Sequence, residues 1–151
     1  SVLARSGIGA YHGWDGGNPA PPPLYESISY YRDKTAPWAF SRQADIVVIN
    51  LGTNDLWTGG SSSALTQAMQ DFMRQVRAAI VWAAGGIMAD YLDEAADAVN
   101  RLGGAAKNYY VCPLPCGPNK GGNGHPTVEQ HRSMADSLVA FLRRNHLVPA
   151  A

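Results

Sequence analysis

Apolar positions along the chain follow two alternating patterns. Short apolar runs, several of them rich in β-branched residues, predict strands at residues 2–4, 46–51, 80–84 and 108–114. The run at 46–51 is unbroken, which is typical of a strand that is covered on both faces. These runs are separated by stretches of a different period, so strands and helices are expected to alternate.

Three stretches carry apolar residues three or four positions apart and predict amphipathic helices. The first follows three serines that can cap it, and its last turn merges into the strand at 80–84. Its apolar positions are Leu65, Met69, Phe72, Val76 and Ile80. The second covers 91–102 and is closed by Gly103 and Gly104, where a helix C-terminus favours glycine. The third begins at Pro126, and its expected buried side is Val128, His131, Met134, Ala135, Leu138 and Leu142.

Strands separated by helices predict an α/β fold with a parallel sheet. No internal repeat or long linker divides the chain, so we expect a single domain over residues 1–151. In parallel sheets the active site lies at the carboxyl ends of the strands. The segments expected there are 6–9, 52–55, 85–86 and the glycine-rich loop that leads to His125.

Charge and composition narrow the range of partners. Twelve basic residues balance twelve acidic ones without a basic cluster, so neither a nucleic acid nor an anionic membrane is expected as a partner. The longest apolar run, 78–84, is far shorter than the roughly 20 residues of a membrane span. The chain opens at Ser1, without an initiator methionine, as a trimmed product would.

Cysteine and histidine spacing does not predict a metal site. Cys112 and Cys116 are too few for a zinc site made of cysteines alone, and HxH and HExxH patterns are absent. The two cysteines could form a small disulfide loop or remain free thiols, and the sequence leaves both alternatives open.

The segment Gly52-Thr53-Asn54-Asp55 directly follows a predicted buried strand. An asparagine at this position can direct its side-chain N–H toward a developing oxyanion. The alternative is a turn that only reverses the chain, and without further context that alternative is favoured.

His125 is expected at the N-cap of the last helix, where it could act as a general base or lie on the surface without a role. His131 falls on the apolar stripe and is expected in the core, whereas His12 and His146 have no neighbours that indicate catalysis. Gly7, just beyond the first predicted strand, can offer its backbone N–H to negative charge. A nucleotide loop is disfavoured there because the third glycine of that motif is missing.

Taken together, three segments resemble the second, third and fifth conserved blocks of the SGNH (GDSL-type) hydrolases: 6–9, 48–55 and His125-Pro126. The resemblance is nearest to carbohydrate esterases that remove acetyl groups, and it extends over nearly the whole chain. It implies a three-layer α/β/α, flavodoxin-like fold and cofactor-independent hydrolysis of a carboxylic ester by a serine. His125 would be the general base, Gly7 and Asn54 would form the oxyanion hole, and Asp55 would brace the turn.

The chain departs from that family in two respects. The Gly-Asp-Ser block, which carries the nucleophile and the first strand, is absent from the 151 residues. We therefore expect that residues 1–151 are the C-terminal portion of a larger domain, or that a second chain completes the sheet; alone they would be inactive. Ser6 is a less favoured substitute nucleophile. Gly122 stands where many members carry an acid, so the backbone around Asn123 and Gly124 is expected to orient the imidazole, as in esterases with a catalytic dyad.

Aromatic residues accumulate near the expected site: Tyr11, Trp14, Tyr25, Tyr30, Tyr31, Trp38 and Trp57. Trp14 and Trp57 follow the two oxyanion segments and are the first candidates for stacking on a sugar ring. The resemblance to the SGNH hydrolases implies an acetylated carbohydrate or another small ester as substrate, and a secreted or periplasmic location. Two alternatives stay open: an inactive SGNH-like carbohydrate-binding module, and a small flavodoxin-like ligand-binding domain.

Overall fold

The computed structural model describes residues 7–14, 27–29, 33–37, 43–87 and 91–149. At its centre lies a sheet of three strands, β3 (Ile46–Ile49), β4 (Ala79–Gly85) and β5 (Tyr109–Leu114), in that order. Both pairs are parallel, with Val48 opposite Val81 and Trp82 opposite Val111. The parallel sheet predicted from the sequence is therefore confirmed, whereas the strand predicted at 2–4 lies outside the described residues.

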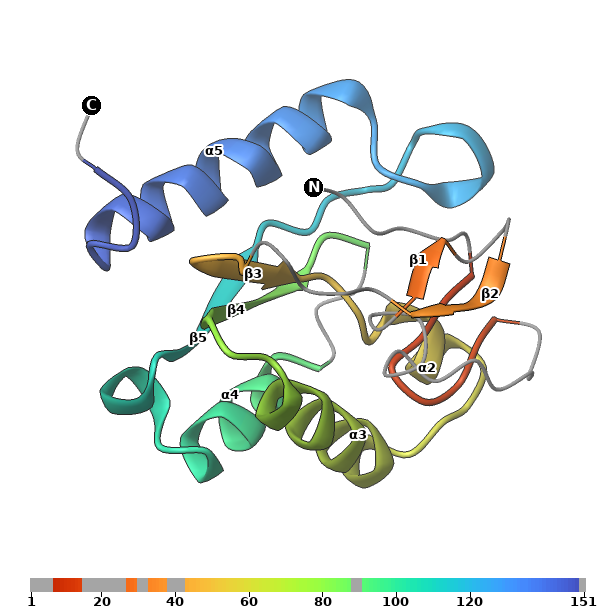
Figure 1. Ribbon diagram of the computed structural model, residues 1–151. Helices are drawn as coiled ribbons and strands as arrows, with labels where there is room; N and C mark the ends of the chain where they lie inside the picture. The colour runs from red at the N-terminus through yellow and green to blue at the C-terminus, as the bar shows by residue number, and fades with distance from the viewer. Residues whose placement is uncertain (1–6, 15–26, 30–32, 38–42, 88–90, 150–151) are drawn as a thin grey trace.

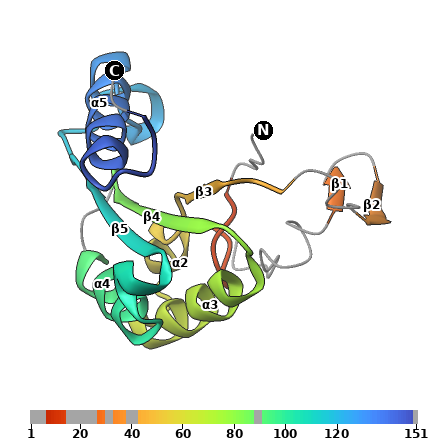
Figure 2. The same ribbon diagram turned by 60° about the vertical axis from the view of Figure 1, so that its left-hand side comes forward.

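Helices cover both faces of this sheet. Helices α3 (Ser62–Gln75) and α4 (Leu92–Arg101) pack on one face, and α5 (Val128–Arg144) lies along the other, as Figures 1 and 2 show. The result is the three-layer α/β/α arrangement that was predicted. The carboxyl ends of the three strands share one edge of the sheet, because the strands run in the same direction.

The larger core lies between the sheet and the α3–α4 layer. Its fully buried members come from all of these elements, among them Leu65, Met69, Ile80, Trp82 and Tyr91. Burying one such side chain stabilises the fold by roughly 1.5–3 kcal/mol. This layer therefore provides the rigid support for the carboxyl edge.

The second core, under α5, is smaller. Its buried residues are Val81, Ala83, Cys112 and Leu114, and α5 covers them with side chains that are only partly buried: Met134, Leu138, Phe141 and Leu142. No residue of α5 itself is buried. The α5 face of the sheet is thus less completely covered than the α3–α4 face.

The first predicted helix ends earlier than its apolar stripe. Ser61 caps α3 by accepting a hydrogen bond from the Ala64 N–H at 3.2 Å, as expected. Val76 is the C-cap and is already extended, so the prediction that Val76 and Ile80 continue the helix is wrong. Both residues are still buried in the same core, Val76 at the end of α3 and Ile80 on β4.

Helix α4 ends as predicted, with Gly103 in the left-handed region at φ 102° just after the C-cap. Asn108 is also left-handed, at φ 62°, so β5 begins one residue later than expected.

The last helix starts later than predicted. Its N-cap is Thr127, which forms a capping box with Gln130, so His125 is not the N-cap. Val128 is 62% exposed and His131 is exposed too, so the prediction that they lie in the core is wrong. Ala135 is likewise exposed. Their apolar spacing describes one side of the helix, but the sheet contacts a neighbouring side.

Five further elements were not predicted. Helix α2 (Thr53–Trp57) follows β3, and β1 (Ser27–Ser29) pairs antiparallel with β2 (Asp33–Pro37) in a separate sheet. Two short 3₁₀ turns, η1 (Gly104–Lys107) and η2 (Gly122–Gly124), precede β5 and α5 respectively.

The two cysteines are free thiols. Cys112 lies in the core under α5, where burial raises the pKa of its thiol, and Cys116 is exposed. Within the described ranges, no three His, Cys, Asp or Glu side chains are grouped so that they could hold a metal ion. Among the same residues no helix is long and apolar enough to cross a membrane.

Candidate functional site

The segment that follows β3 enters a short helix instead of a simple turn. Gly52 is the N-cap of α2, with φ 124°. A Cβ atom at this position would lie 2.9 Å from Cε2 of Tyr91, so both the backbone conformation and the packing require glycine. Where the sequence favoured a simple turn, the structure has the short helix α2. Asn54 and Asp55 lie in its first turn.

Asp55 joins this helix to the loop at residues 7–14. Its side chain is fully buried and accepts three backbone hydrogen bonds, from Ala10 N at 2.8 Å, Tyr11 N at 2.8 Å and His12 N at 2.9 Å. A carboxylate that accepts several backbone N–H groups satisfies donors which would otherwise be buried without partners. Asp55 therefore holds the loop that contains Gly7 against α2.

Asn54 lies beside the backbone of the same loop. Its Nδ2 donates to the carbonyl oxygen of Ile8 at 2.7 Å, and the side chain is partly buried. A carboxamide carries two N–H donors. One of them is used by Ile8, and within the described residues Nδ2 makes no second hydrogen bond. The structure thus brings Asn54 next to the loop that contains Gly7, through the carbonyl of Ile8.

Gly7 has φ 75°, and a Cβ atom there would overlap the indole of Trp14. The backbone N–H of Trp14 donates to the Gly7 carbonyl at 3.0 Å, which closes the loop at residues 7–14. Trp14 is 63% exposed and Trp57 is 71% exposed, and both lie near the two segments that were predicted to form an oxyanion hole.

The other predicted residues of this region divide into two groups. Tyr11 is partly buried and donates its hydroxyl to the Ser61 carbonyl at 3.2 Å, so it fastens the loop. Ser6 and the aromatic residues Tyr25, Tyr30, Tyr31 and Trp38 lie outside the described residues.

His125 is exposed, at the end of the turn η2. Its Nδ1 lies 3.2 Å from the Gly122 carbonyl and 3.1 Å from the Asn123 carbonyl. Both groups are acceptors, so Nδ1 is the protonated nitrogen and the lone pair of Nε2 is left for proton transfer. Asn123 (φ 54°) and Gly124 (φ 73°) are left-handed, which curls the chain around the ring. Gly124 therefore affects the His125 ring only through its backbone conformation. The hydrogen bonds of His125 Nδ1 are accepted by the carbonyls of Gly122 and Asn123.

The loop that carries His125 is fastened to β4 and α5 by two amide side chains. Asn119 donates to the Ile87 carbonyl at 2.9 Å, just beyond β4. Gln130 Oε1 accepts from Thr127 N at 2.8 Å, while its Nε2 makes a long contact of 3.5 Å to Asn119 Oδ1. These contacts connect the start of α5 to the carboxyl edge of the sheet.

Four of the predicted residues thus form one cluster, and His125 lies on a separate segment. Gly7, Trp14, Asn54 and Asp55 are held together by direct contacts. His125 lies on the segment that leaves β5 at the same edge, since Figure 1 shows that segment and α2 at the carboxyl ends of the strands. Among the described residues, the His125 side chain makes no hydrogen bond with Asn54 or with residues 7–14.

Sequence reasoning missed three residues of this region. His12 was set aside, yet its Nδ1 lies 2.6 Å from the Thr58 hydroxyl, beside Asp55. Tyr91 and Trp82 fall within a predicted helix and a predicted strand that were given no functional role, and both contact the segment before Asn54. No local pattern indicates these contacts, because the partners lie tens of residues apart in the chain.

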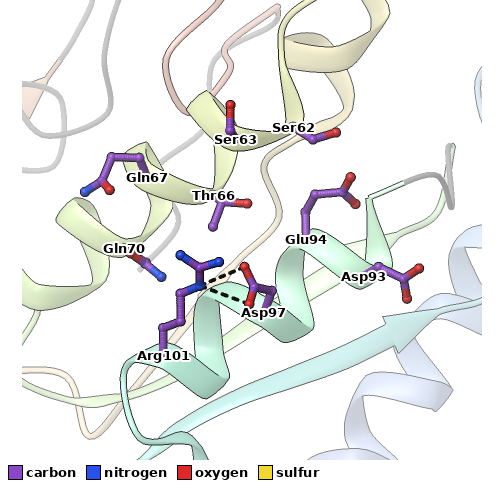
Figure 3. Close-up of a pocket in the computed structure, with 9 residues that line it drawn as sticks. All are labelled: Ser62, Ser63, Thr66, Gln67, Gln70, Asp93, Glu94, Asp97 and Arg101. Atoms are coloured by element: carbon purple, nitrogen blue, oxygen red, sulfur yellow. Dashed lines mark hydrogen bonds and ion pairs between the residues drawn. The ribbon is translucent and has the colours of Figure 1, made fainter.

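A separate polar groove of about 460 Å³ lies between α3 and α4. Figure 3 shows its nine lining residues, with the exposed ion pair of Asp97 and Arg101 at 2.9 Å on one wall. None of the predicted site residues lines it, so the groove is distinct from the cluster at the carboxyl edge.

Comparison with known proteins shows that this arrangement is similar to that of carbohydrate esterases. A scan against family models found no match. The chain is 28% identical over 164 residues to "Cellulase/esterase CelE" of Acetivibrio thermocellus, covering 95% of this chain and 19% of that protein. It superposes on a family two carbohydrate esterase from Clostridium thermocellum in complex with cellohexaose, with TM-score 0.75 and 27% identity. An active-site mutant from the same organism gives TM-score 0.77 and 25% identity.

These matches cover 91% of this chain and 47% of each solved esterase chain, so the chain spans about half of their length. In fold and in sequence, the chain is therefore similar to the family two carbohydrate esterases, and its α/β architecture is the SGNH fold that was predicted.

Proposed function

We propose that this chain provides the general base and the oxyanion hole of a serine carboxylic-ester hydrolase that removes acetyl groups from carbohydrate. The observation that carries the proposal is the Asn54–Ile8 hydrogen bond of 2.7 Å, which places a carboxamide beside Gly7 at the carboxyl edge of the sheet. The similarity to carbohydrate esterases supports the reaction class.

In the proposed reaction, Nε2 of His125 takes the proton of a serine hydroxyl as the serine oxygen attacks the acetyl carbonyl. The Gly7 N–H and the Asn54 Nδ2–H stabilise the tetrahedral oxyanion. Collapse of this intermediate breaks the bond to the sugar oxygen, which receives the proton from His125. Water then attacks the acetyl-serine by the same route, and acetate leaves.

The Gly122 and Asn123 carbonyls take the place of a carboxylate acid in this proposal. They hold Nδ1–H and so fix the tautomer, but they carry no full charge and do not ionise. The pH–rate profile should therefore lack a sharp acidic limb from a third catalytic residue.

We propose further that another segment supplies the nucleophile and completes the sheet. Among the described strands β3 pairs with β4 alone, so its other edge is open. Val48 on β3 is 42% exposed, although β-branched residues of a parallel strand are normally covered. A strand ending in Gly-Asp-Ser would pair with this edge, either from the same polypeptide, of which residues 1–151 would be the C-terminal portion, or from a second chain.

Trp14 and Trp57 support a carbohydrate substrate. Their exposed indoles lie next to the Gly7 loop and at the end of α2, where they could stack on sugar rings. A polysaccharide substrate further suggests a secreted or periplasmic enzyme.

A second candidate function is binding of carbohydrate without hydrolysis. It is favoured by one observation: none of the 151 residues forms a Gly-Asp-Ser block. A serine-reactive phosphonate probe separates the two candidates when it is applied to the protein as encoded, including any residues ahead of Ser1. An enzyme is labelled and loses esterase activity, whereas a binding module is not labelled.

The catalytic assignment is tested by Asn54→Ala in an assay of acetyl-ester hydrolysis. Loss of one oxyanion donor should lower kcat by about 10²–10³ while KM changes little. Asn100→Ala, on α4, is the matched control and should leave kcat unchanged. Equal kcat in Asn54→Ala and in the wild type would contradict the assignment.

A further inference from the structure

Tyr91 is a buried hydroxyl-bearing side chain that the proposed reaction does not use. It is fully buried at the start of α4, and its hydroxyl accepts from Gly85 N at 3.0 Å and reaches the Gly85 carbonyl at 3.4 Å. Its ring packs against Gly52, and the Thr53 side chain faces its hydroxyl. Tyr91 therefore contacts the ends of both β3 and β4.

Trp82 supports the same segment from β4. It is fully buried, and its indole stacks on Tyr91 with ring centroids 6.2 Å apart and an interplanar angle of 29°. Its Nε1 donates to the Leu51 carbonyl at 2.9 Å. The two aromatic side chains thus contact residues 51, 52 and 53 in succession, directly before Asn54.

These contacts matter because an oxyanion donor acts only when it is already aimed at the position of the developing charge. Asn54 is set by the backbone that leads into α2, and this backbone contains a glycine with φ 124°. A glycine has more conformations to choose from than other residues, so this segment needs external contacts to hold one of them. The Trp82 indole N–H, the Tyr91 ring against Gly52 and the Tyr91 hydroxyl against the Thr53 side chain supply those contacts.

We propose that Tyr91 and Trp82 are positioning residues that hold the Leu51–Thr53 backbone so that the Asn54 amide points at the Ile8 carbonyl, next to Gly7. Both act through that backbone and touch no reacting atom. The inference deepens the proposed function and rests on it, but the geometry it concerns is a property of this chain alone and can be measured without any ester substrate.

The first test is Tyr91→Phe, which keeps the ring against Gly52 and removes the hydroxyl. In the folded variant we expect the NMR signals of the Asn54 side-chain amide to shift and the backbone amides of residues 52–54 to exchange roughly tenfold faster. Tyr110→Phe is the matched control, because Tyr110 is a half-buried tyrosine on β5 that packs edge-on to Phe141 under α5. It should leave the Asn54 signals unchanged. Unchanged Asn54 signals in Tyr91→Phe would overturn the proposal.

A second measurement needs no variant. In the wild-type chain the Trp82 indole N–H and the Leu56 backbone N–H, which donates to the Gly52 carbonyl at 3.2 Å, should be released by the same opening event. Their opening equilibria in hydrogen exchange should therefore agree within about threefold. Opening of the Leu56 amide that is a hundredfold more frequent than opening of the Trp82 indole would contradict the proposal.

The activity readout separates this inference from the proposed function. In the protein as encoded, Tyr91→Phe should lower kcat for acetyl-ester hydrolysis by about tenfold with KM unchanged. If the wild type shows no hydrolysis, the proposed function fails, and the two NMR measurements still decide whether Tyr91 and Trp82 position Asn54. If hydrolysis is present and kcat is unchanged in Tyr91→Phe, the positioning role fails alone.

Discussion

At the scale of single residues, Asp55 joins two segments that lie 43–45 positions apart in the chain. Three backbone N–H groups donate to the two oxygens of its buried carboxylate. The side chain at this position must therefore offer two hydrogen-bond acceptors and no donor. The Gly7 loop therefore depends on this side chain for its position beside Asn54.

Replacing Asp55 by asparagine puts an NH₂ group where an oxygen accepts hydrogen bonds. At least one buried backbone donor then faces another donor, so Asp55→Asn should lower the free energy of unfolding by about 2–4 kcal/mol. Urea denaturation of the variant and of the wild type measures this difference in the free energy of unfolding. Asp71→Asn is the control, because its 2.8 Å ion pair with Arg74 is half exposed and should contribute less than about 1 kcal/mol. Equal effects of the two substitutions would contradict this role of Asp55.

Tyr91 should also make stability depend on pH in alkaline solution. Burial raises the pKa of its hydroxyl above the ordinary value of about 10. Above pH 10 the unfolded chain loses this proton while the folded chain keeps it, so the unfolded state binds fewer protons and stability falls as pH rises. Urea unfolding between pH 8 and 11 should show this decline, and Tyr91→Phe should reduce its slope. Identical slopes in both proteins would contradict the prediction.

Trp14 is the residue whose removal tests the sugar platform. Trp14→Ala should raise KM for an acetylated oligosaccharide by about three- to tenfold, which corresponds to roughly 0.5–1.5 kcal/mol of stacking energy. Hydrolysis of p-nitrophenyl acetate by the same variant should hardly change, since that substrate has no sugar ring. Equal losses on the two substrates would tell against a stacking role.

At the scale of elements, the capping box of α5 links a helix start to the loop that carries His125. Thr127→Ala removes the acceptor of the 3.3 Å bond from Gln130 N and should cost about 1 kcal/mol of stability. It should also loosen the Gln130–Asn119 contact, which broadens the His125 ring signals in NMR. Ser133→Ala, on an exposed position of the same helix, should change stability by less than about 0.5 kcal/mol. Equal stability of Thr127→Ala and wild type would contradict this account.

The elements that the sequence predicted well are those with a strong local period. Residues 46–49, 62–75, 79–85, 92–101 and 109–114 follow from β-branched runs and apolar stripes, because one buried face imposes that spacing. The exposure of Val128 and His131 could not be predicted, since apolar spacing defines one side of a helix but not what covers it. Gly7, Asn54 and His125 were selected as candidate site residues from short motifs. The contacts of Tyr91, Trp82 and Asp55 depend on pairs of residues far apart in the chain.

At the scale of the whole molecule, the α3–α4 face is closed and the α5 face is not. Val48, Val128 and Val139 are all more than 40% exposed, and β3 has one partner among the described strands. An open strand edge beside exposed apolar side chains is a disfavoured surface for a stable domain. The proposed completing strand would cover the edge of β3, and it would bring the serine to the edge that holds Asn54.

Val48→Lys tests whether a further strand completes the sheet beside β3. In residues 1–151 alone the new ammonium group should stay hydrated, and the free energy of unfolding should change by less than about 1 kcal/mol. In the protein with its completing segment the same side chain would be covered, and the loss should reach several kcal/mol. Equal small losses in both proteins would mean that nothing packs on this part of β3.

A crystal structure of the encoded protein after reaction with an acetyl-ester-mimicking phosphonate tests the arrangement most directly. The account predicts a phosphonyl oxygen about 2.7–3.1 Å from both the Gly7 nitrogen and Asn54 Nδ2, with His125 Nε2 facing the modified serine. A phosphonyl oxygen bound by other donors, or a His125 ring turned away from the adduct, would contradict it.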